Sequence, residues 1–258
     1  SSHDMNEEIQ IPPEGLNLGG KLISDHQYFE SVRFEDVLLK SSNIAMVRLA
    51  QSLPKDALIK CLDKLGLFHP SYIALPGEVA GRYQGQGAVE TATMSYGYGL
   101  AVNLISMANA YNVIANRGHD VGVHILKNAL RTSRPSVIKP EVCDTITRMM
   151  QRVVDYGVSS RRAAIEGMGV AGKSGTTRLL SKQGEYESSY LSSFAGFAPA
   201  HSPRVVVAVM VKKPTKHGYY GGRVAAPIFS ELAKVALHYQ SMEGLNAGDQ
   251  RLLSSTTE

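Results

Sequence analysis

The chain up to Tyr156 carries apolar side chains at the three- and four-residue spacing of helices with one buried side. Helices are predicted to begin at Asn43 and Pro54, and others to run from Leu104 to about Ala115 and from Pro140 to about Tyr156. Gly66 is expected to end the second helix, because glycine is common just after a helix. The side chains predicted to face the core are Met46, Leu49, Ala50 and Leu53, then Leu58, Cys61, Leu62 and Leu65, then Ile105, Ala108, Tyr111 and Asn112, and finally Val142, Ile146, Met149, Met150 and Val153.

Beyond the last of these helices, β-branched residues and short turns replace the helical spacing. Strands are predicted over 169–177, 192–198 and 204–212, with residues 199–203 as a short hairpin loop. A closing helix over 225–239 is predicted to bury Ile228, Leu232, Val235, Ala236 and Tyr239. Helices followed by adjacent strands and a last helix indicate an α+β fold, in which helices cover an antiparallel sheet. A doubly wound parallel sheet is not expected.

Composition narrows the classes of function. With 258 residues, 43% hydrophobic and 19% charged, the chain can form one large globular domain. The net charge of +4 is spread along the sequence without a long basic stripe, so a nucleic-acid partner is not expected. No apolar run approaches the roughly 20 residues that cross a bilayer, and no signal peptide is present. We therefore expect this chain by itself to be soluble.

The sequence suggests three regions. Residues 1–5 resemble the remnant of an expression tag, 6–243 form one partial domain, and 244–258 form a polar tail that is expected to fray. Cys61 and Cys143 lie in predicted helices, where lone cysteines are usually small buried hydrophobes. No Cys-x-x-Cys or His-x-x-x-His spacing occurs, so neither a metal nor an organic cofactor is expected.

Two short motifs carry the candidate chemistry. Ser41-Ser42-Asn43 precedes an apolar helix, and Lys173-Ser174-Gly175-Thr176 lies on the first predicted strand. Taken separately, the first motif is typical of a helix N-cap and the second of a turn. Taken together and in this order, they match two of the three elements of serine acyl-transferases, Ser-x-Asn and Lys-[Ser/Thr]-Gly.

Several longer segments extend this match. They are Lys40-Ser41-Ser42-Asn43-Ile44, Ser95-Tyr96-Gly97-Tyr98-Gly99-Leu100, Gly172-Lys173-Ser174-Gly175-Thr176, Phe194-Ala195-Gly196-Phe197-Ala198-Pro199 and the run from Tyr219-Tyr220-Gly221-Gly222 to Pro227. With these segments, roughly residues 16 to 240 resemble the transpeptidase domain of class B penicillin-binding proteins, most closely the division-specific, penicillin-binding protein 3-like type.

The resemblance implies a function for the full-length protein. It would be a peptidoglycan D,D-transpeptidase that cross-links stem peptides ending in D-Ala-D-Ala during septal cell-wall synthesis. β-Lactam antibiotics would acylate it, which makes it a target relevant to antibiotic resistance. The resemblance also implies division proteins as partners and a place on the periplasmic face of the bacterial inner membrane. An anchor and a further domain upstream of this chain would hold it there.

The resemblance also implies roles for the first motif and for the lysine. Ser41 would relay a proton towards the leaving amine, and Asn43 would hold the substrate amide. Lys173 would add positive charge near the terminal carboxylate of the substrate and help to keep the catalytic lysine neutral. Ser42 is expected to border the substrate or β-lactam.

The rest of the second motif is expected to bind the substrate. Ser174 and Thr176 would offer hydroxyls to its carboxylate, and Gly175 would let it lie along the strand edge. The backbone N–H of Thr176 would form one half of the oxyanion hole. Tyr219 and Gly221, in the loop after the third strand, are expected to complete the substrate-binding side.

One departure from the family pattern is serious. Ser-x-x-Lys, which supplies the nucleophilic serine and its base, is expected several tens of residues before Ser-x-Asn. Only forty residues precede Ser41, and none of them forms this pattern. The two matches, Ser52-Leu53-Pro54-Lys55 and Ser136-Val137-Ile138-Lys139, come after it and are interpreted as chance. This chain is therefore expected to be inactive by itself.

Other functions remain as alternatives. A class A β-lactamase needs a deacylating glutamate, and Glu78 stands at a suitable distance, but the leucine and asparagine expected after it are missing. A D,D-carboxypeptidase uses similar chemistry with water as acceptor, and the Phe-Ala-Gly-Phe-Ala-Pro and Tyr-Tyr-Gly-Gly segments argue against it. The alternative from another class is a non-catalytic binding or scaffold module of the division machinery.

Overall fold

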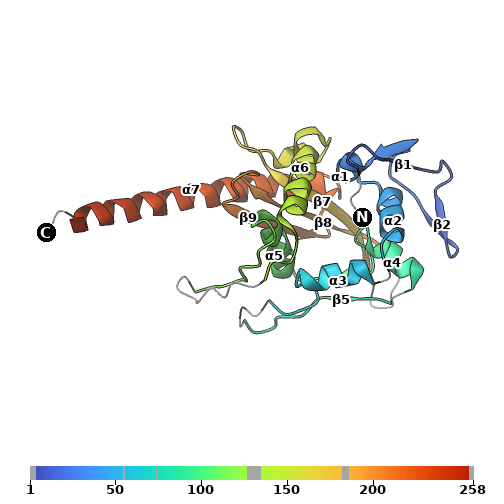
Figure 1. The fold of residues 1–258 in the computed structure, drawn as a ribbon, viewed down its shortest axis with the longest axis horizontal. Helices are drawn as coiled ribbons and strands as arrows, with labels where there is room; N and C mark the ends of the chain where they lie inside the picture. The colour runs from blue at the N-terminus through green and yellow to red at the C-terminus, as the bar shows by residue number, and fades with distance from the viewer. Residues whose placement is uncertain are drawn as a thin grey trace.

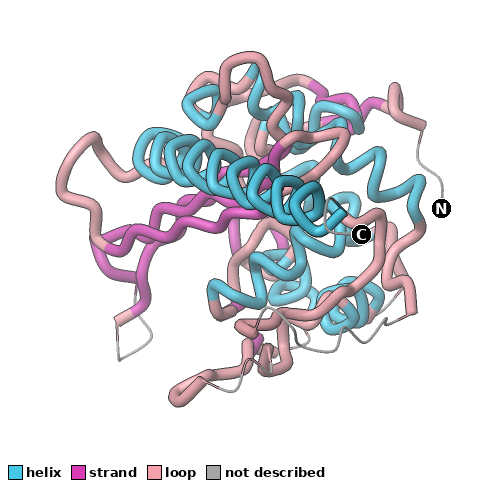
Figure 2. Tube along the Cα trace, turned by 90° about the vertical axis from the view of Figure 1, so that its left-hand side faces the viewer, coloured by secondary structure: helices cyan, strands magenta, loops and turns pink. Residues whose placement is uncertain are grey.

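The computed structural model describes residues 4–54, 56–71, 73, 75–85, 87–126, 135–181 and 186–255, without the side chains of 243–255. A three-stranded antiparallel sheet with the order β7-β8-β9 lies at its centre. Its strands are β7 (Ala171–Leu180), β8 (Tyr186–Ala198) and β9 (Val205–Lys212). Helix α7 (Gly221–Ser255) packs on this sheet, as Figures 1 and 2 show. The predicted α+β fold, with an antiparallel sheet covered by helices, is confirmed.

The alternation of side chains along the strands produces two cores, one on each face of the sheet. Phe194 packs with Phe229 of α7, their ring centroids 4.8 Å apart. Phe197, three residues further along β8, packs on the other face against Met150. Two helices supply that second layer, α5 (Leu104–Ala115) and α6 (Pro140–Tyr156). Both helices have the bounds predicted from the sequence.

A third core belongs to the N-terminal part of the chain (Figure 1). Strand β1 (Glu8–Gln10) pairs with β4 (Ser31–Arg33), and β2 (Leu16–Leu18) pairs with β3 (Lys21–Ile23). The chain then forms the 3-10 turn η1 (Phe34–Asp36), the single turn α1 (Val37–Lys40) and α2 (Asn43–Gln51). Ile44 and Val47 of α2 are buried here with apolar residues of the short strands. This part of the chain carries the first motif.

The segments between the N-terminal part and the sheet are short. They comprise α3 (Ala57–Lys64), β5 (Arg82–Tyr83), α4 (Ala88–Met94), β6 (Leu100–Ala101) and, before β7, the 3-10 turn η2 (Ser160–Ala163). Helix α4 was not predicted, because a seven-residue helix is too short to show a clear period. None of the described helices combines the length and apolar character needed to span a bilayer.

The predicted buried face of α7 is wrong at four of its five positions, and only Ala236 packs partly against the core as expected. Ile228, Leu232, Val235 and Tyr239 are 41%, 49%, 67% and 63% exposed, whereas Ala225, Ala226, Phe229, Ala233 and Leu237 are buried. A helix lying close against a sheet has room for alanines and one ring, so the small residues mark the contact face. The helix also continues past Tyr239 and Gly244 to Ser255, where a frayed tail was expected.

Smaller errors concern single positions. Leu53 lies beyond the end of α2, Ile105 and Val142 are 37% and 45% exposed, and Ile44, Val47 and Val113 are buried in places where the pattern favoured their neighbours. Cys61 is exposed, contrary to expectation, whereas Cys143 is buried as predicted; both thiols are free.

Candidate active site

One cleft of about 880 Å³ brings both motifs together, although they are far apart in the sequence. The N-terminal part lines one side, with the segments 21–26, 37–43 and 95–98. Strand β7 and the start of α7 line the other side. All nine residues singled out from the sequence border this cleft: Ser41, Ser42, Asn43, Lys173, Ser174, Gly175, Thr176, Tyr219 and Gly221. Their chemical roles stay predictions.

Ser41 occupies an unusual backbone conformation. It caps the C-terminus of α1 with φ 54° and ψ 38°, in the left-handed region that residues other than glycine seldom adopt. Such a conformation costs on the order of 1 kcal/mol and persists where the surrounding structure imposes it. Its hydroxyl lies in the cleft and accepts a hydrogen bond of 2.5 Å from Lys173 Nζ, 132 residues away in the sequence.

Ser42 is the N-cap of α2, as the local sequence pattern predicts. Its hydroxyl accepts a 3.0 Å hydrogen bond from the N–H of Ala45 and donates one of 2.6 Å to Asp25 Oδ2. Asp25 Oδ1 in turn accepts from the N–H of Ile44, at 3.1 Å. The Ser42 hydroxyl is thus engaged by the helix end and by Asp25, and this residue holds its neighbours in place instead of presenting a free group to a ligand.

Asn43 is the first residue of α2 and borders the cleft. Its Nδ2 donates a 3.0 Å hydrogen bond to the backbone carbonyl of Ser24. That bond fixes which end of the amide faces the N-terminal loop and leaves Oδ1 as an acceptor. An amide held in this way can accept a hydrogen bond from the N–H of a bound peptide.

Lys173 lies on β7 and is deeply placed in the cleft. Its ammonium group also donates to the carbonyl of Ser174 at 3.0 Å. Burial disfavours the charged form and lowers the pKa of Lys173 from 10.5 to about 8. At neutral pH the side chain is therefore still mostly protonated, but it deprotonates far more readily than an exposed lysine.

The rest of the second motif forms the wall beside Lys173. Ser174 Oγ lies 3.1 Å from Ser160 Oγ of η2, a partner that the sequence did not suggest. Thr176 Oγ1 accepts a 2.9 Å hydrogen bond from the N–H of Gly221, which joins the strand to the start of α7. A Cβ at Gly221 would lie 2.3 Å from the carbonyl oxygen of Gly175. Only glycine permits this approach, so the need for Gly221 is steric.

Tyrosines surround the far end of the cleft. Tyr190 of β8 stacks on Tyr219 at 3.9 Å between ring centroids and 9° between planes, and Tyr219 tilts against Tyr220 at 4.6 Å. The hydrogen bond from Tyr219 to Tyr220 raises the pKa of Tyr219 to about 12. Tyr186 meets Tyr98 edge to face at 5.9 Å. The cleft therefore offers flat apolar surfaces beside its charged and hydroxyl groups.

Several cleft residues escaped the sequence analysis. Asp25, Tyr186 and Tyr190 belong to no recognisable motif, and only their alternation on strands or their place in a loop turns them towards the cleft. Ser160 likewise belongs to no motif, and it supports the cleft from η2 through its contact with Ser174. Arg178 also borders the cleft, and it donates to the carbonyls of Glu187 and Tyr186 at 3.1 and 3.3 Å. Tyr98, which belongs to the Ser95–Leu100 segment, also borders the cleft.

The two Ser-x-x-Lys matches lie elsewhere. Ser52 Oγ donates to the carbonyl of Leu49 at 2.8 Å and Ser136 Oγ to that of Ile138 at 2.8 Å. Neither serine is among the described residues that line the cleft, and Lys55 lies outside the described residues. Glu78, the candidate deacylating glutamate, is bonded to Ser71 away from the cleft. The interpretation of these patterns as chance matches agrees with their positions.

Comparisons of this chain with known proteins agree with one another. The penicillin-binding protein transpeptidase domain matches residues 3–234. The probable peptidoglycan D,D-transpeptidase PbpC of Pseudomonas aeruginosa is 36% identical over 232 residues, or 89% of this chain and 41% of that protein. The peptidoglycan D,D-transpeptidase FtsI of Escherichia coli K12 is 32% identical over 250 residues, or 95% of this chain and 42% of that protein. The chain thus spans about two fifths of the length of these relatives.

Solved structures agree with the sequence relatives. The apo TP domain of Burkholderia pseudomallei penicillin-binding protein 3 superposes with a TM-score of 0.82 at 34% identity, covering 94% of this chain and 73% of that one. Penicillin-binding protein 3 of Mycobacterium tuberculosis, complexed with aztreonam, superposes with a TM-score of 0.79 at 26% identity. That match covers 92% of this chain and 58% of that one.

Proposed function

Because the chain belongs to the transpeptidase family of penicillin-binding proteins, in its class B, penicillin-binding protein 3-like branch, we propose that the full-length protein cross-links peptidoglycan. Its substrate is a stem peptide ending in D-Ala-D-Ala, and its reaction is acyl transfer through a serine. The nucleophilic serine and its base come from a Ser-x-x-Lys segment ahead of Ser-x-Asn, a pattern that none of the forty residues before Ser41 forms.

The contact between Lys173 Nζ and Ser41 Oγ carries the proposal. Two residues 132 positions apart meet at 2.5 Å in a cleft that also holds Asn43 and the rest of the second motif. Acyl transfer needs a path for the proton that the nucleophile loses and the leaving amine gains. A serine hydroxyl that accepts from a lysine of lowered pKa can carry a proton along such a path.

The same cleft suits the carboxyl end of the substrate. β7 is an edge strand of the described sheet, so an extended peptide can lie beside it by backbone hydrogen bonding. Lys173, mostly protonated at pH 7, attracts the terminal carboxylate, and Ser174 and Thr176 add hydroxyl donors. The N–H of Thr176 supplies one donor of the oxyanion hole, where each donor contributes about 3 kcal/mol to the transition state.

The same proposal extends to the inhibitors, the location and the partners of the full-length protein. β-Lactams bind as analogues of the substrate and acylate the serine of the full-length protein, an idea supported by the aztreonam complex of the M. tuberculosis neighbour. The protein acts on the periplasmic face of the inner membrane, with division proteins as partners. The name FtsI of the E. coli relative supports a role in the cell-wall synthesis of division.

Labelling with a fluorescent penicillin tests the proposal. We expect the product of the complete gene to be labelled, and its Lys173→Ala variant to be labelled at least about tenfold more slowly, because acylation loses a group of the proton path. The 258-residue chain alone should keep its mass after incubation with penicillin. A complete gene product that contains no upstream Ser-x-x-Lys and is not labelled would instead favour the non-catalytic scaffold. A labelled 258-residue chain would mean that another serine acts as nucleophile.

A further inference from the structure

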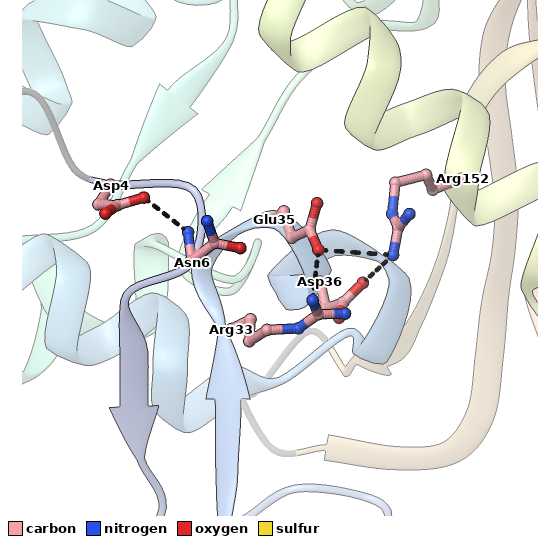
Figure 3. Close-up of polar contacts among 6 residues, drawn as sticks. All are labelled: Asp4, Asn6, Arg33, Glu35, Asp36 and Arg152. Atoms are coloured by element: carbon pink, nitrogen blue, oxygen red, sulfur yellow. Dashed lines mark hydrogen bonds and ion pairs between the residues drawn. The ribbon is translucent and has the colours of Figure 1, made fainter.

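Four charged side chains, Arg33, Glu35, Asp36 and Arg152, form a cluster at the start of α1 (Figure 3). Asp36 is buried, 7% exposed, and both of its carboxylate oxygens accept hydrogen bonds from arginines. Arg152 Nη2 donates to Oδ1 at 2.6 Å and Arg33 Nη2 donates to Oδ2 at 2.8 Å. Glu35 Oε1 lies 2.9 Å from Arg33 Nη1 and 3.9 Å from Arg152 Nη2. The cluster is therefore charge-balanced, with two arginines and two carboxylates.

The two arginines come from different parts of the fold. Arg33 ends β4, three residues before Asp36, so its bond stays within one short segment. Arg152 belongs to α6, 116 residues away, and its guanidinium lies over the ring of Tyr156 at 5.6 Å, which further fixes its position. Of these two arginines, only Arg152 joins the N-terminal part of the chain to the helical layer on the sheet.

The segment that Asp36 begins is too short to hold itself in place. α1 has four residues, and one isolated helical turn is not stable in water. It bridges two cores, because Val37 packs in the N-terminal core and Leu38 packs against the core of Phe197 and Met150. Ser41 follows directly in its left-handed conformation. The location of the Ser41 hydroxyl thus depends on what fixes the two ends of this turn.

We propose that Asp36 and Arg152 are a positioning pair that holds α1, and through it the Ser41 hydroxyl, against Lys173. Charge-assisted hydrogen bonds to a buried carboxylate are short and directional, which apolar contacts of Val37 and Leu38 are not. Burial acts to raise the pKa of Asp36, but the bonds from Arg152 and Arg33 outweigh it and lower the pKa, so the carboxylate stays charged. The catalytic meaning of this pair rests on the function proposed above.

The matched pair of variants Arg152→Gln and Arg33→Gln tests this inference in the 258-residue chain. Both remove one positive charge and one donor to Asp36, but only Arg152→Gln cuts the connection to α6. The readout is the pKa of Lys173, followed by NMR of ¹³Cε-labelled lysine and assigned by the loss of its signal in Lys173→Gln. Circular dichroism and amide dispersion verify that each variant is folded.

We expect the pKa of Lys173 to rise by about one unit from its value near 8 in Arg152→Gln, because a displaced Ser41 admits water to the ammonium. Arg33→Gln should shift it by less than about a third of that. Asp36→Asn should also raise it, although the loss of a nearby negative charge by itself favours the neutral amine and so acts in the opposite direction. Asp144 also lies on α6, and Asp144→Asn, which breaks its 2.8 Å pair with Arg117, should leave the pKa of Lys173 unchanged.

Equal shifts in Arg152→Gln and Arg33→Gln, or no shift in either while both stay folded, would overturn the inference. Should Arg152→Gln fail to fold, Arg152→Lys is the milder variant, because it keeps the charge and one donor. In that case an unchanged pKa of Lys173 in the Asp36→Asn variant would count against the inference. The readout needs no substrate. Failure of the penicillin experiment would therefore refute the proposed function without touching this result, and the reverse also holds.

Discussion

Replacement of Ser42 by alanine tests whether this serine stabilises the fold. Ser42 Oγ accepts from the N–H of Ala45 at 3.0 Å and donates to Asp25 at 2.6 Å, and the residue is 1% exposed. Loss of the N-cap bond costs about 1 kcal/mol. The loss of a donor to the part-buried Asp25 carboxylate adds roughly 1 to 2 kcal/mol. The change therefore weakens the start of α2 by about 2 to 3 kcal/mol in all.

Amide hydrogen exchange measures this loss locally. A cost of about 2 to 3 kcal/mol raises the opening equilibrium at Ala45 roughly 30- to 150-fold. Asn103→Ala is the matched control, because Asn103 caps α5 by accepting a 2.7 Å hydrogen bond from the N–H of Ser106, and its Nδ2 donates to the exposed carbonyl of Val79 and not to a carboxylate. It should accelerate exchange at Ser106 only about fivefold. Equal effects at both caps would refute the reasoning that Asp25 adds to the Ser42 cap.

Three further changes have definite expected outcomes. Gly221→Ala places a Cβ 2.3 Å from a backbone carbonyl, so it should destabilise the fold by about 2 to 3 kcal/mol in thermal unfolding, although glycine to alanine normally stabilises a helix. Because the pKa of Lys173 falls from 10.5 to about 8 on folding, its unfolded form binds more protons between these values, and stability should rise with pH there. Lys173→Met should remove this rise, and a rise that persists would assign it to another group. A thiol reagent should modify the exposed Cys61 at once in the native protein but the buried Cys143 only after unfolding, and equal rates would contradict the packing.

The elements of this fold follow from local pattern more reliably than their orientation does. The period of α5 and α6 and the β-branched run of β9 are properties of neighbouring residues, and their positions were predicted closely. The contact face of α7 was not, because the pattern of large apolar residues points to Leu232 and Val235, whereas close packing on the sheet selects Ala225 and Ala233. Local periodicity identifies an apolar side but cannot weigh it against a partner surface.

The candidate site divides in the same way. Its motif residues could be chosen from the sequence, since Ser-x-Asn and Lys-Ser-Gly are compact patterns with a known chemical meaning. Asp25, Tyr186 and Tyr190 could not be chosen, because each reaches the cleft through strand alternation or loop geometry. The division of labour between the adjacent Ser41 and Ser42 was also hidden, since it depends on which hydroxyl the helix end engages.

By itself, the sequence determined the family, the α+β order of elements, the two motifs and the absence of Ser-x-x-Lys from the forty residues before Ser41. Only the tertiary structure decided that Ser41 meets Lys173 and that Asp36 is tied to Arg152. The physical reason is distance along the chain. Contacts between residues 116 or 132 positions apart are set by how strands and helices pack, and no local pattern encodes that packing.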